Sequence, residues 1–235
     1  MAPAPISIVG DSFGCGEWAI DYNTKSGLIN SHTGTSHYLK KANYRVNNYS
    51  EGGASLLDIL DQITNNNISN ETIIVFATDA FRHCHKYQPL LRKLFLQKDY
   101  SISKLHFIFF QDWLKQLTKI SKDNTCEVIL VGGHSNLYEF DVPSNMTICT
   151  NSWLSDILAK PIGNLSGIDT TAIENLMQLK PITKDVQKQE LLDILSQRAS
   201  RLHATANSRN KFADHIHPNR ECHKLLTDKI IKLLG

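Results

Sequence analysis

The chain has 235 residues, 25 Lys and Arg against 23 Asp and Glu, and a formal net charge of +2 at pH 7. Its hydrophobic content of 41% and charged content of 20% are ordinary for a globular protein with a well-buried core. The near balance of charge gives no support for a nucleic-acid or membrane partner, and no stretch reaches the roughly 18 apolar residues of a membrane helix.

The first residues, Met-Ala-Pro-Ala-Pro, lack the basic region and apolar core of a secretory signal. The five cysteines are odd in number and widely spread, which favours reduced thiols over a disulfide framework. We therefore expect a cytoplasmic protein.

Five apolar runs predict buried strands, at 6–11, 44–50, 73–77, 128–131 and 146–149. Amphipathic stretches predict helices at 55–63, 102–120, 184–202 and 221–234. Near-continuous apolar strands are typical of a parallel sheet that is covered on both faces. Strands alternating with helices predict one doubly wound α/β domain over residues 1–235.

The stretch at about 151–211 interrupts this pattern and is interpreted as a helical insertion. It carries Pro161, Gly163, Gly167 and Pro181 before a polar helix. Three interpretations stay open. The insertion covers or flanks a site, supports self-association into a homo-oligomer, or forms a solvated peripheral pair of helices.

The first predicted strand runs directly into Gly10-Asp11-Ser12. This places a serine hydroxyl at the carboxyl end of a strand, where open α/β sheets bind ligands. Gly14 and Gly16 would keep the following turn open to a substrate oxygen. The alternative is an ordinary Asp-Ser helix cap after a strand.

The turns after the second and third predicted strands carry further candidates. Gly53 can offer an unobstructed backbone N–H to a developing oxyanion, or it can serve a plain strand-to-helix turn. Thr78 or Asp79 could bind substrate and Arg82 could brace Asp79, so Asp79 and Arg82 are candidates for the substrate-binding site; the alternative is that Asp79 caps a helix.

A second informative motif, Asp214-x-x-His217-Pro218, lies just before the last predicted helix. Pro218 suits the first turn of that helix. A neutral His217 imidazole could take the proton of Ser12 while Asp214 holds its tautomer. A nucleophile, a base and an orienting carboxylate predict acyl transfer to and from esters.

The motifs at the two ends of the chain resemble those of the SGNH hydrolases, also called GDSL-type esterases and lipases. Gly53 and the turn after the third strand match more weakly. The resemblance implies a flavodoxin-like three-layer α/β/α fold with Ser12 as nucleophile, His217 as general base and then acid, and Asp214 as its orienter. It also implies that the Ser12 and Gly53 N–H groups form the oxyanion hole. The pattern is similar to SGNH-like proteins of bacteria and their phages.

One departure from the family concerns the third oxyanion donor. The family places Gly-x-Asn-Asp after the third strand, whereas this chain has Phe76-Ala77-Thr78-Asp79, with Thr78 at the Asn position. A threonine hydroxyl can donate but reaches less far. Asn136, after the fourth strand, is expected to line the crevice. Trp18 is a candidate for substrate contact, with a core position as the alternative.

The sequence thus predicts a serine esterase that hydrolyses a small acyl ester, such as an acetyl group on a carbohydrate, through an acyl-enzyme on Ser12. The alternatives are an O-acyltransferase and a non-catalytic binding module, the latter motivated by the missing Asn. No cofactor is expected, and adjacent ligand types such as His83-Cys84-His85 do not make a metal site. Cys15 is a second candidate nucleophile but is expected to be a buried filler.

Overall fold

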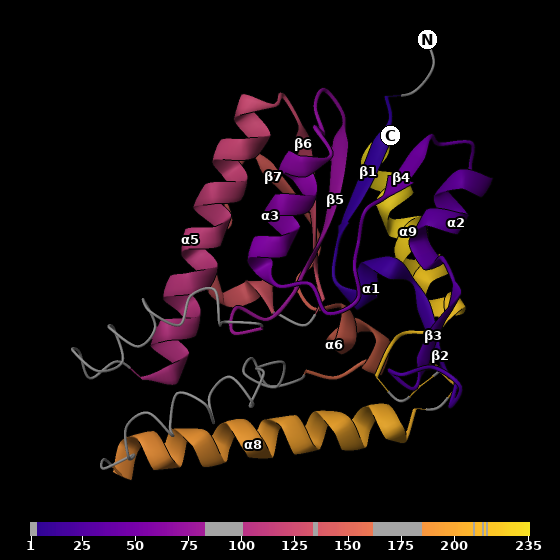
Figure 1. The fold of residues 1–235 in the computed structure, drawn as a ribbon. Helices are drawn as coiled ribbons and strands as arrows, with labels where there is room; N and C mark the ends of the chain where they lie inside the picture. The colour runs from indigo at the N-terminus through magenta and orange to yellow at the C-terminus, as the bar shows by residue number, and fades with distance from the viewer. Residues whose placement is uncertain are drawn as a thin grey trace.

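The computed structural model describes residues 4–82, 101–133, 136–161, 185–208, 210–212, 214 and 216–235. A central sheet of five parallel strands has the order β4-β1-β5-β6-β7 (Figure 1). The strands are β1 (Ile6–Gly10), β4 (Val46–Asn48), β5 (Thr72–Ala77), β6 (Glu127–Gly132) and β7 (Met146–Thr150). The five predicted strands are all present, although β4 is shorter than the predicted 44–50.

Helices cover both faces of this sheet. Helices α3 (Leu56–Asn65) and α5 (Ile102–Asp123) share one core with Val9, Val75 and Leu130. Helices α6 (Trp153–Leu158) and α9 (Arg220–Leu234) share the other core with Ile8, Ile74 and Val131, and α2 (Gly34–Lys41) packs against α9. Alternate strand residues thus face opposite layers. The predicted three-layer α/β/α fold is confirmed, and its strand order is that of flavodoxin-like sheets.

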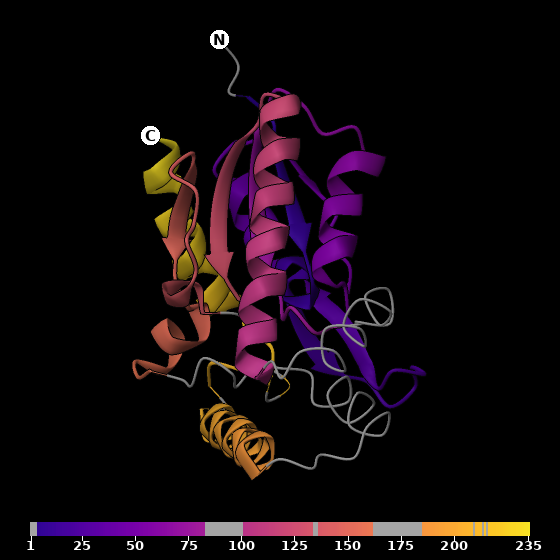
Figure 2. The ribbon, with the colours of Figure 1, turned by 90° about the vertical axis from the view of Figure 1, so that its left-hand side faces the viewer.

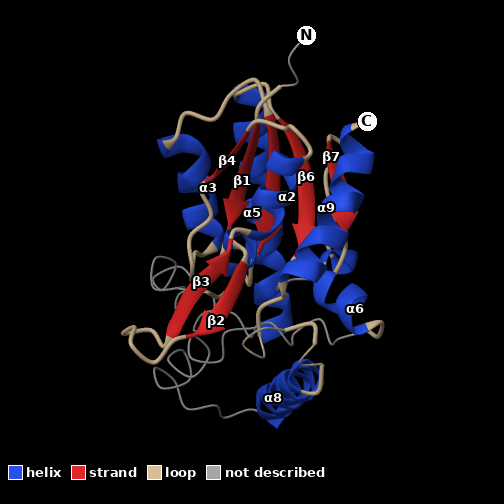
Figure 3. Ribbon diagram, turned by 90° about the vertical axis from the view of Figure 1, so that its right-hand side faces the viewer, coloured by secondary structure: helices blue, strands red, loops and turns tan. Residues whose placement is uncertain are grey.

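Several elements were not predicted from the sequence. They are the one-turn helix α1 (Ser12–Cys15), the antiparallel hairpin of β2 (Glu17–Ile20) and β3 (Leu28–His32), and helices α2 and α6. The only buried large apolar side chain of α2 is Leu39, so that helix shows no amphipathic repeat. The hairpin extends beyond the sheet at the end where α8 (Asp185–Ala206) also lies (Figure 3).

The described parts of the predicted insertion occupy two different places. Trp153, Leu154 and Ile157 of α6 are buried in the second core. Helix α8 instead lies across the carboxyl ends of the strands, beyond the body of the sheet (Figures 1 and 2). The carboxylate of Glu190 on α8 accepts hydrogen bonds from the N–H groups of Ile102 and Ser103 at 2.8 and 2.9 Å, so α8 caps the start of α5. Residues 162–184 lie outside the described ranges.

Candidate active site

Ser12 lies where the sequence predicted it, at the carboxyl end of β1. Asp11 is the N-cap of α1 and its Oδ1 accepts the Phe13 N–H at 2.9 Å, so Ser12 is the first residue of that helix. Its side chain sits at the edge of the sheet, and the residue is 5% exposed. The helix cap and the candidate nucleophile are therefore features of the same turn.

The structure brings Ser12, His217 and Asp214 together. The Ser12 Oγ lies 2.9 Å from Nε2 of His217, and Nδ1 of His217 lies 2.6 Å from Oδ2 of Asp214. The other oxygen of Asp214 accepts the backbone N–H groups of His217 at 2.7 Å and of Ile216 at 3.1 Å. Burial raises the pKa of Asp214, but the hydrogen bonds from His217 and Ile216 outweigh it and hold that pKa below its ordinary value. The carboxylate is therefore ionised and aligned to orient the imidazole.

An ion pair that the sequence did not reveal positions the histidine loop. The buried Glu17 of β2 accepts hydrogen bonds from the backbone N–H, Nε and Nη2 of Arg220, which begins α9 just after His217. Arg220 thereby ties the loop that carries His217 to the hairpin that follows Ser12. The hydrogen bond from Arg220, which exceeds the opposing effect of burial, lowers the pKa of Glu17 to about 2.

We expect Glu17→Gln to destabilise the fold in a pH-dependent way. Because the pKa of Glu17 falls from 4.5 to about 2 on folding, its carboxylate stabilises the native state fully above pH 4.5. This contribution is lost as the pH falls toward about 2. Urea unfolding at several pH values should show a difference between wild type and variant that is largest near neutrality and shrinks in acid.

The matched control is Glu221→Gln, which changes an exposed glutamate in the first turn of α9. The difference in unfolding free energy between that variant and the wild type should not show this dependence on pH. A Glu17→Gln difference that stays constant across the acid range would contradict the assignment.

Gln62 of α3 is a second residue that the sequence analysis missed. It pairs with both backbone groups of Gly10, accepting the N–H at 2.8 Å and donating to the carbonyl at 3.0 Å. Gly10 has a φ of 152° and lies so close to β5 that a Cβ there would be 2.7 Å from the Cβ of Phe76. The only sequence signal was a glutamine on the buried face of a predicted helix, one turn after Ile59. These contacts fix the backbone that leads into Ser12.

Gly53 lies in the turn between β4 and α3. That turn is joined to the end of β1 because the Glu51 N–H donates to the Gly10 carbonyl at 3.1 Å. Gly53 adopts a φ of 84°, which favours glycine. No described residue accepts a hydrogen bond from the N–H of Ser12 or of Gly53. The two predicted oxyanion donors therefore have N–H groups available for a ligand.

The turn after β5 differs from its predicted arrangement. Arg82 does not form an ion pair with Asp79; its Nη1 binds Oδ2 of Asp11 at 2.7 Å and Oγ1 of Thr78 at 3.2 Å. Asp79 instead faces Nε2 of the buried His106 at 3.3 Å. The expectation that Arg82 braces Asp79 is therefore wrong, because the carboxylate of the Gly-Asp-Ser motif is the nearer partner. Thr78 is fully buried, and its hydroxyl oxygen is held by Arg82.

Trp18 and Asn136 have structural partners that the sequence could not show. The indole N–H of Trp18 donates to the Ser12 carbonyl at 2.8 Å, and its ring centroid lies 5.6 Å from that of His217. Trp18 is thus part of the immediate surroundings of the candidate triad. Asn136 caps a short 3₁₀ helix (Leu137–Glu139) by accepting the Tyr138 N–H at 3.1 Å. A role for Asn136 in substrate binding stays a prediction.

No protein-family model matches the chain, and a search of curated proteins finds no match. The fold is similar to two solved structures. One is a candidate GDSL-like lipase from Parabacteroides merdae, with 12% identity and a TM-score of 0.43 over 99% of this chain and 95% of the other. The second is LAE5, an α/β hydrolase enzyme from the metagenome of Lake Arreo, with 14% identity and a TM-score of 0.45 over 100% of this chain and 97% of the other.

The thiol of Cys15 is a poor nucleophile in this environment. Burial, assisted by the nearby carboxylates of Asp11 and Glu51, raises its pKa to about 12. It is therefore protonated at neutral pH and does not compete with Ser12. Among the described residues, no group of three or more His, Cys, Asp or Glu side chains is placed to hold a metal ion. His83, Cys84 and His85 lie outside the described ranges.

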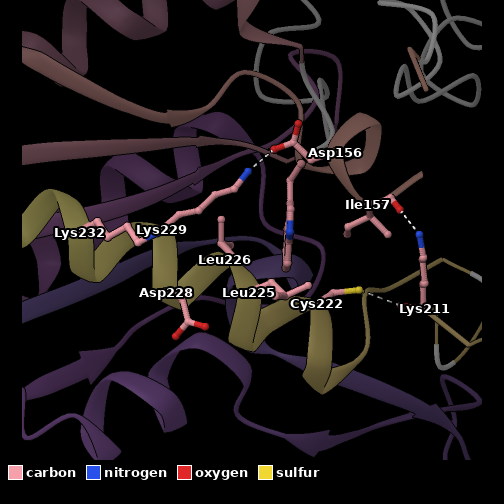
Figure 4. A pocket seen from close by; sticks show the side chains of 10 residues that line it. Asp156, Ile157, Lys211, Cys222, Leu225, Leu226, Asp228, Lys229 and Lys232 are labelled. Atoms are coloured by element: carbon pink, nitrogen blue, oxygen red, sulfur yellow. Dashed lines mark hydrogen bonds and ion pairs between the residues drawn. The ribbon is translucent and has the colours of Figure 1, made fainter. Parts of the chain in front are cut away.

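A cavity of about 480 Å³ lies between α6 and α9 (Figure 4). At its rim Lys229 pairs with Asp156 at 2.8 Å, and Lys211 donates to the Ile157 carbonyl at 2.6 Å. Neither Ser12, His217 nor Asp214 lines it. This cavity is therefore separate from the candidate active site.

Among the helices that the structure describes, none combines the length and the apolar character that crossing a bilayer requires.

Proposed function

We propose that this protein is a serine ester hydrolase that uses Ser12, His217 and Asp214. The observation that carries the proposal is the continuous hydrogen-bonded line from Ser12 Oγ to His217 Nε2 at 2.9 Å and from His217 Nδ1 to Asp214 Oδ2 at 2.6 Å. A hydroxyl in contact with a base that is itself oriented by a carboxylate is the arrangement of acyl-transfer enzymes.

The reaction follows from this geometry. Ser12 Oγ attacks the ester carbonyl carbon and passes its proton to His217 Nε2, while Asp214 stabilises the resulting imidazolium. The N–H groups of Ser12 and Gly53 stabilise the oxyanion. When the carbon–oxygen bond to the alcohol breaks, His217 returns the proton to the leaving alcohol. Water then gives a proton to His217 and attacks the acyl carbon. The bond from that carbon to Ser12 Oγ breaks, His217 returns the proton to Oγ, and the carboxylic acid leaves.

The proposed substrate is a small acyl ester, such as an acetyl group on a carbohydrate. The small acyl group is taken from the breadth of the family that the end motifs resemble. Trp18, beside His217, supplies an aromatic surface of the kind that sugars stack on. Asp79 and Arg82 lie in the turn after β5, at the same edge of the sheet.

Hydrolysis of 4-nitrophenyl acetate and covalent labelling by a fluorophosphonate probe test this proposal. Both should depend on Ser12, with the Ser12→Ala variant as the control. Equal rates and equal labelling for the two proteins would favour the non-catalytic binding module instead.

Thr78 is proposed as the third oxyanion donor, held in place by Arg82. We expect Thr78→Val to lower kcat for 4-nitrophenyl acetate by about 10²-fold, with little change in KM, because the lost hydrogen bond forms in the transition state. Thr78→Ser keeps the hydroxyl and should retain most of the activity. Since Thr78 is buried and bonded to Arg82, thermal melting should be recorded for both variants. An unchanged kcat in folded Thr78→Val would remove Thr78 from the oxyanion hole.

A further inference from the structure

Helix α8 presents a regular inward-facing stripe to the rest of the domain. Ile194, Ala204 and Thr205 on this stripe are buried, with 0%, 6% and 3% exposure. Arg198 and Arg201 lie between them at the helical spacings of four and seven residues from Ile194, and both are partly buried. The face of α8 that points toward the domain is therefore built from apolar or small residues, except for these two arginines.

The placement of α8 brings Arg201 to the candidate active site. One end of α8 is held by the cap that Glu190 forms on α5. Near the other end, Arg201, Leu202 and Thr205 line a narrow crevice together with Phe13, Leu154 and Ile216. Phe13 follows Ser12 in the chain and Ile216 precedes His217, so Arg201 lies against the two segments that carry the nucleophile and the base.

The guanidinium of Arg201 has no hydrogen bond or ion pair among the described residues. The charged groups that act on it are Arg198, Asp79 and Arg82. Of these, Arg82 is bound to Asp11, and Asp79 faces His106 at 3.3 Å. Burial and the two neighbouring arginines lower the pKa of Arg201 to about 10, against the effect of Asp79, so this arginine is still charged at neutral pH.

A largely desolvated cation without a bonded anion is unfavourable, and an anionic ligand that pairs with it is favoured. The planar guanidinium fork matches a carboxylate in two hydrogen bonds.

We propose that Arg201 is a specificity-determining residue that binds a carboxylate carried by the ester substrate. This proposal rests on the proposed hydrolase function and narrows its substrate class to anionic esters. The carboxylate belongs either to the acyl part or to the alcohol part of the ester, and the same guanidinium would bind it in both cases.

Two matched substrate pairs test the proposal. For the acyl side, mono-4-nitrophenyl glutarate is compared with 4-nitrophenyl pentanoate. For the alcohol side, 4-acetoxybenzoate is compared with phenyl acetate. In each pair the measured quantity is the ratio of kcat/KM for the anionic ester to that for the neutral ester.

Arg201→Gln should lower this ratio by about tenfold to a hundredfold in one of the two pairs, the range expected for a hydrogen bond between charged groups. The pair in which the ratio falls identifies the part of the substrate that carries the carboxylate. Arg201→Lys keeps the positive charge but loses the two parallel N–H donors of the guanidinium. Its ratio should therefore lie between those of the wild type and of Arg201→Gln. Lys119→Gln, which removes one exposed positive charge from α5, should leave the ratio unchanged.

A ratio that is the same in wild type and both Arg201 variants, for both pairs, would overturn the proposal while the hydrolase function stands. A second measurement needs no turnover. Monomethyl glutarate and 4-acetoxybenzoate are titrated into Ser12→Ala protein and into the same protein with Arg201→Gln, followed by calorimetry. Binding of one anion that is lost with Arg201→Gln supports the carboxylate site even where hydrolysis itself is absent. Equal binding to the two proteins, or binding of neither anion, contradicts it.

Discussion

Replacing Ser12 with alanine should lower kcat for 4-nitrophenyl acetate by at least about 10³-fold and abolish fluorophosphonate labelling. The variant removes Oγ of Ser12, which lies 2.9 Å from Nε2 of His217. The backbone N–H of residue 12 stays in the first turn of α1, so the oxyanion hole and the fold should persist. The remaining rate would then measure what binding and the oxyanion hole achieve without covalent catalysis. Steady-state kinetics and intact-protein mass spectrometry after labelling give the two readouts.

The matched control is Ser121→Ala. Ser121 is a buried serine of α5 whose hydroxyl donates to the Thr118 carbonyl at 3.0 Å, far along the chain from the candidate site. That variant should keep wild-type labelling and kcat. If Ser12→Ala protein melts like the wild type and still hydrolyses the ester at the wild-type rate, Ser12 is not the nucleophile and the proposed function fails.

Asp214→Asn should lower kcat by about 10⁴-fold. The amide can still accept the N–H groups of Ile216 and His217 through one oxygen, so the loop should keep its shape. It cannot stabilise a positive imidazolium, and an amide NH₂ facing Nδ1 favours the tautomer that carries its proton on Nε2. That tautomer has no lone pair with which to accept the proton of Ser12. The loss should therefore appear in kcat, with KM for 4-nitrophenyl acetate little changed.

Asp228→Asn supplies the control for removing one negative charge. Asp228 is an exposed residue of α9 that pairs with Lys224 at 3.1 Å. Its variant should retain full activity. An Asp214→Asn enzyme with more than about one tenth of wild-type kcat would mean that His217 needs no carboxylate partner, against the role assigned to such groups.

The geometry of the site depends on connections between distant parts of the chain. Glu17 and Arg220 join the segment after Ser12 to the segment after His217. Trp18, next to Glu17, binds the Ser12 carbonyl and lies beside the His217 ring. The hairpin β2–β3 therefore acts as a brace between nucleophile and base. These contacts of the hairpin keep Ser12 and His217 within hydrogen-bonding distance of each other.

The parts that the sequence predicted correctly depend on local patterns. Apolar runs identified the five strands of the sheet, and amphipathic repeats identified α3, α5, α8 and α9. The Asp214-x-x-His217 spacing was informative because one short loop lets a carboxylate reach both the backbone and the ring of a histidine three residues later. Helices without an apolar repeat, such as α2, left no comparable signal.

The pairing of Arg82 shows why other parts could not be predicted. Proximity in sequence favoured Asp79 as its partner, whereas folding places it against Asp11, 71 residues earlier in the chain. Gln62 on Gly10 and Glu190 on α5 are further examples, with sequence separations of 52 and 88 residues. Each of these three pairings depends on which helix and strand ends the fold brings together.

By itself, the sequence determined the α/β class, the order along the chain of the five sheet strands and of α3, α5, α8 and α9, and the residue types of a serine, a histidine and an aspartate at the two ends of the chain. These follow from hydrophobic periodicity and from contacts between residues a few positions apart. Only the tertiary structure decided that Arg82 binds Asp11, that Glu17 anchors the histidine loop, and that α8 carries Arg201 to the edge of the site. The physical reason is that parallel strands bring their carboxyl ends to one edge, so the side chains that meet there come from segments that local patterns do not connect.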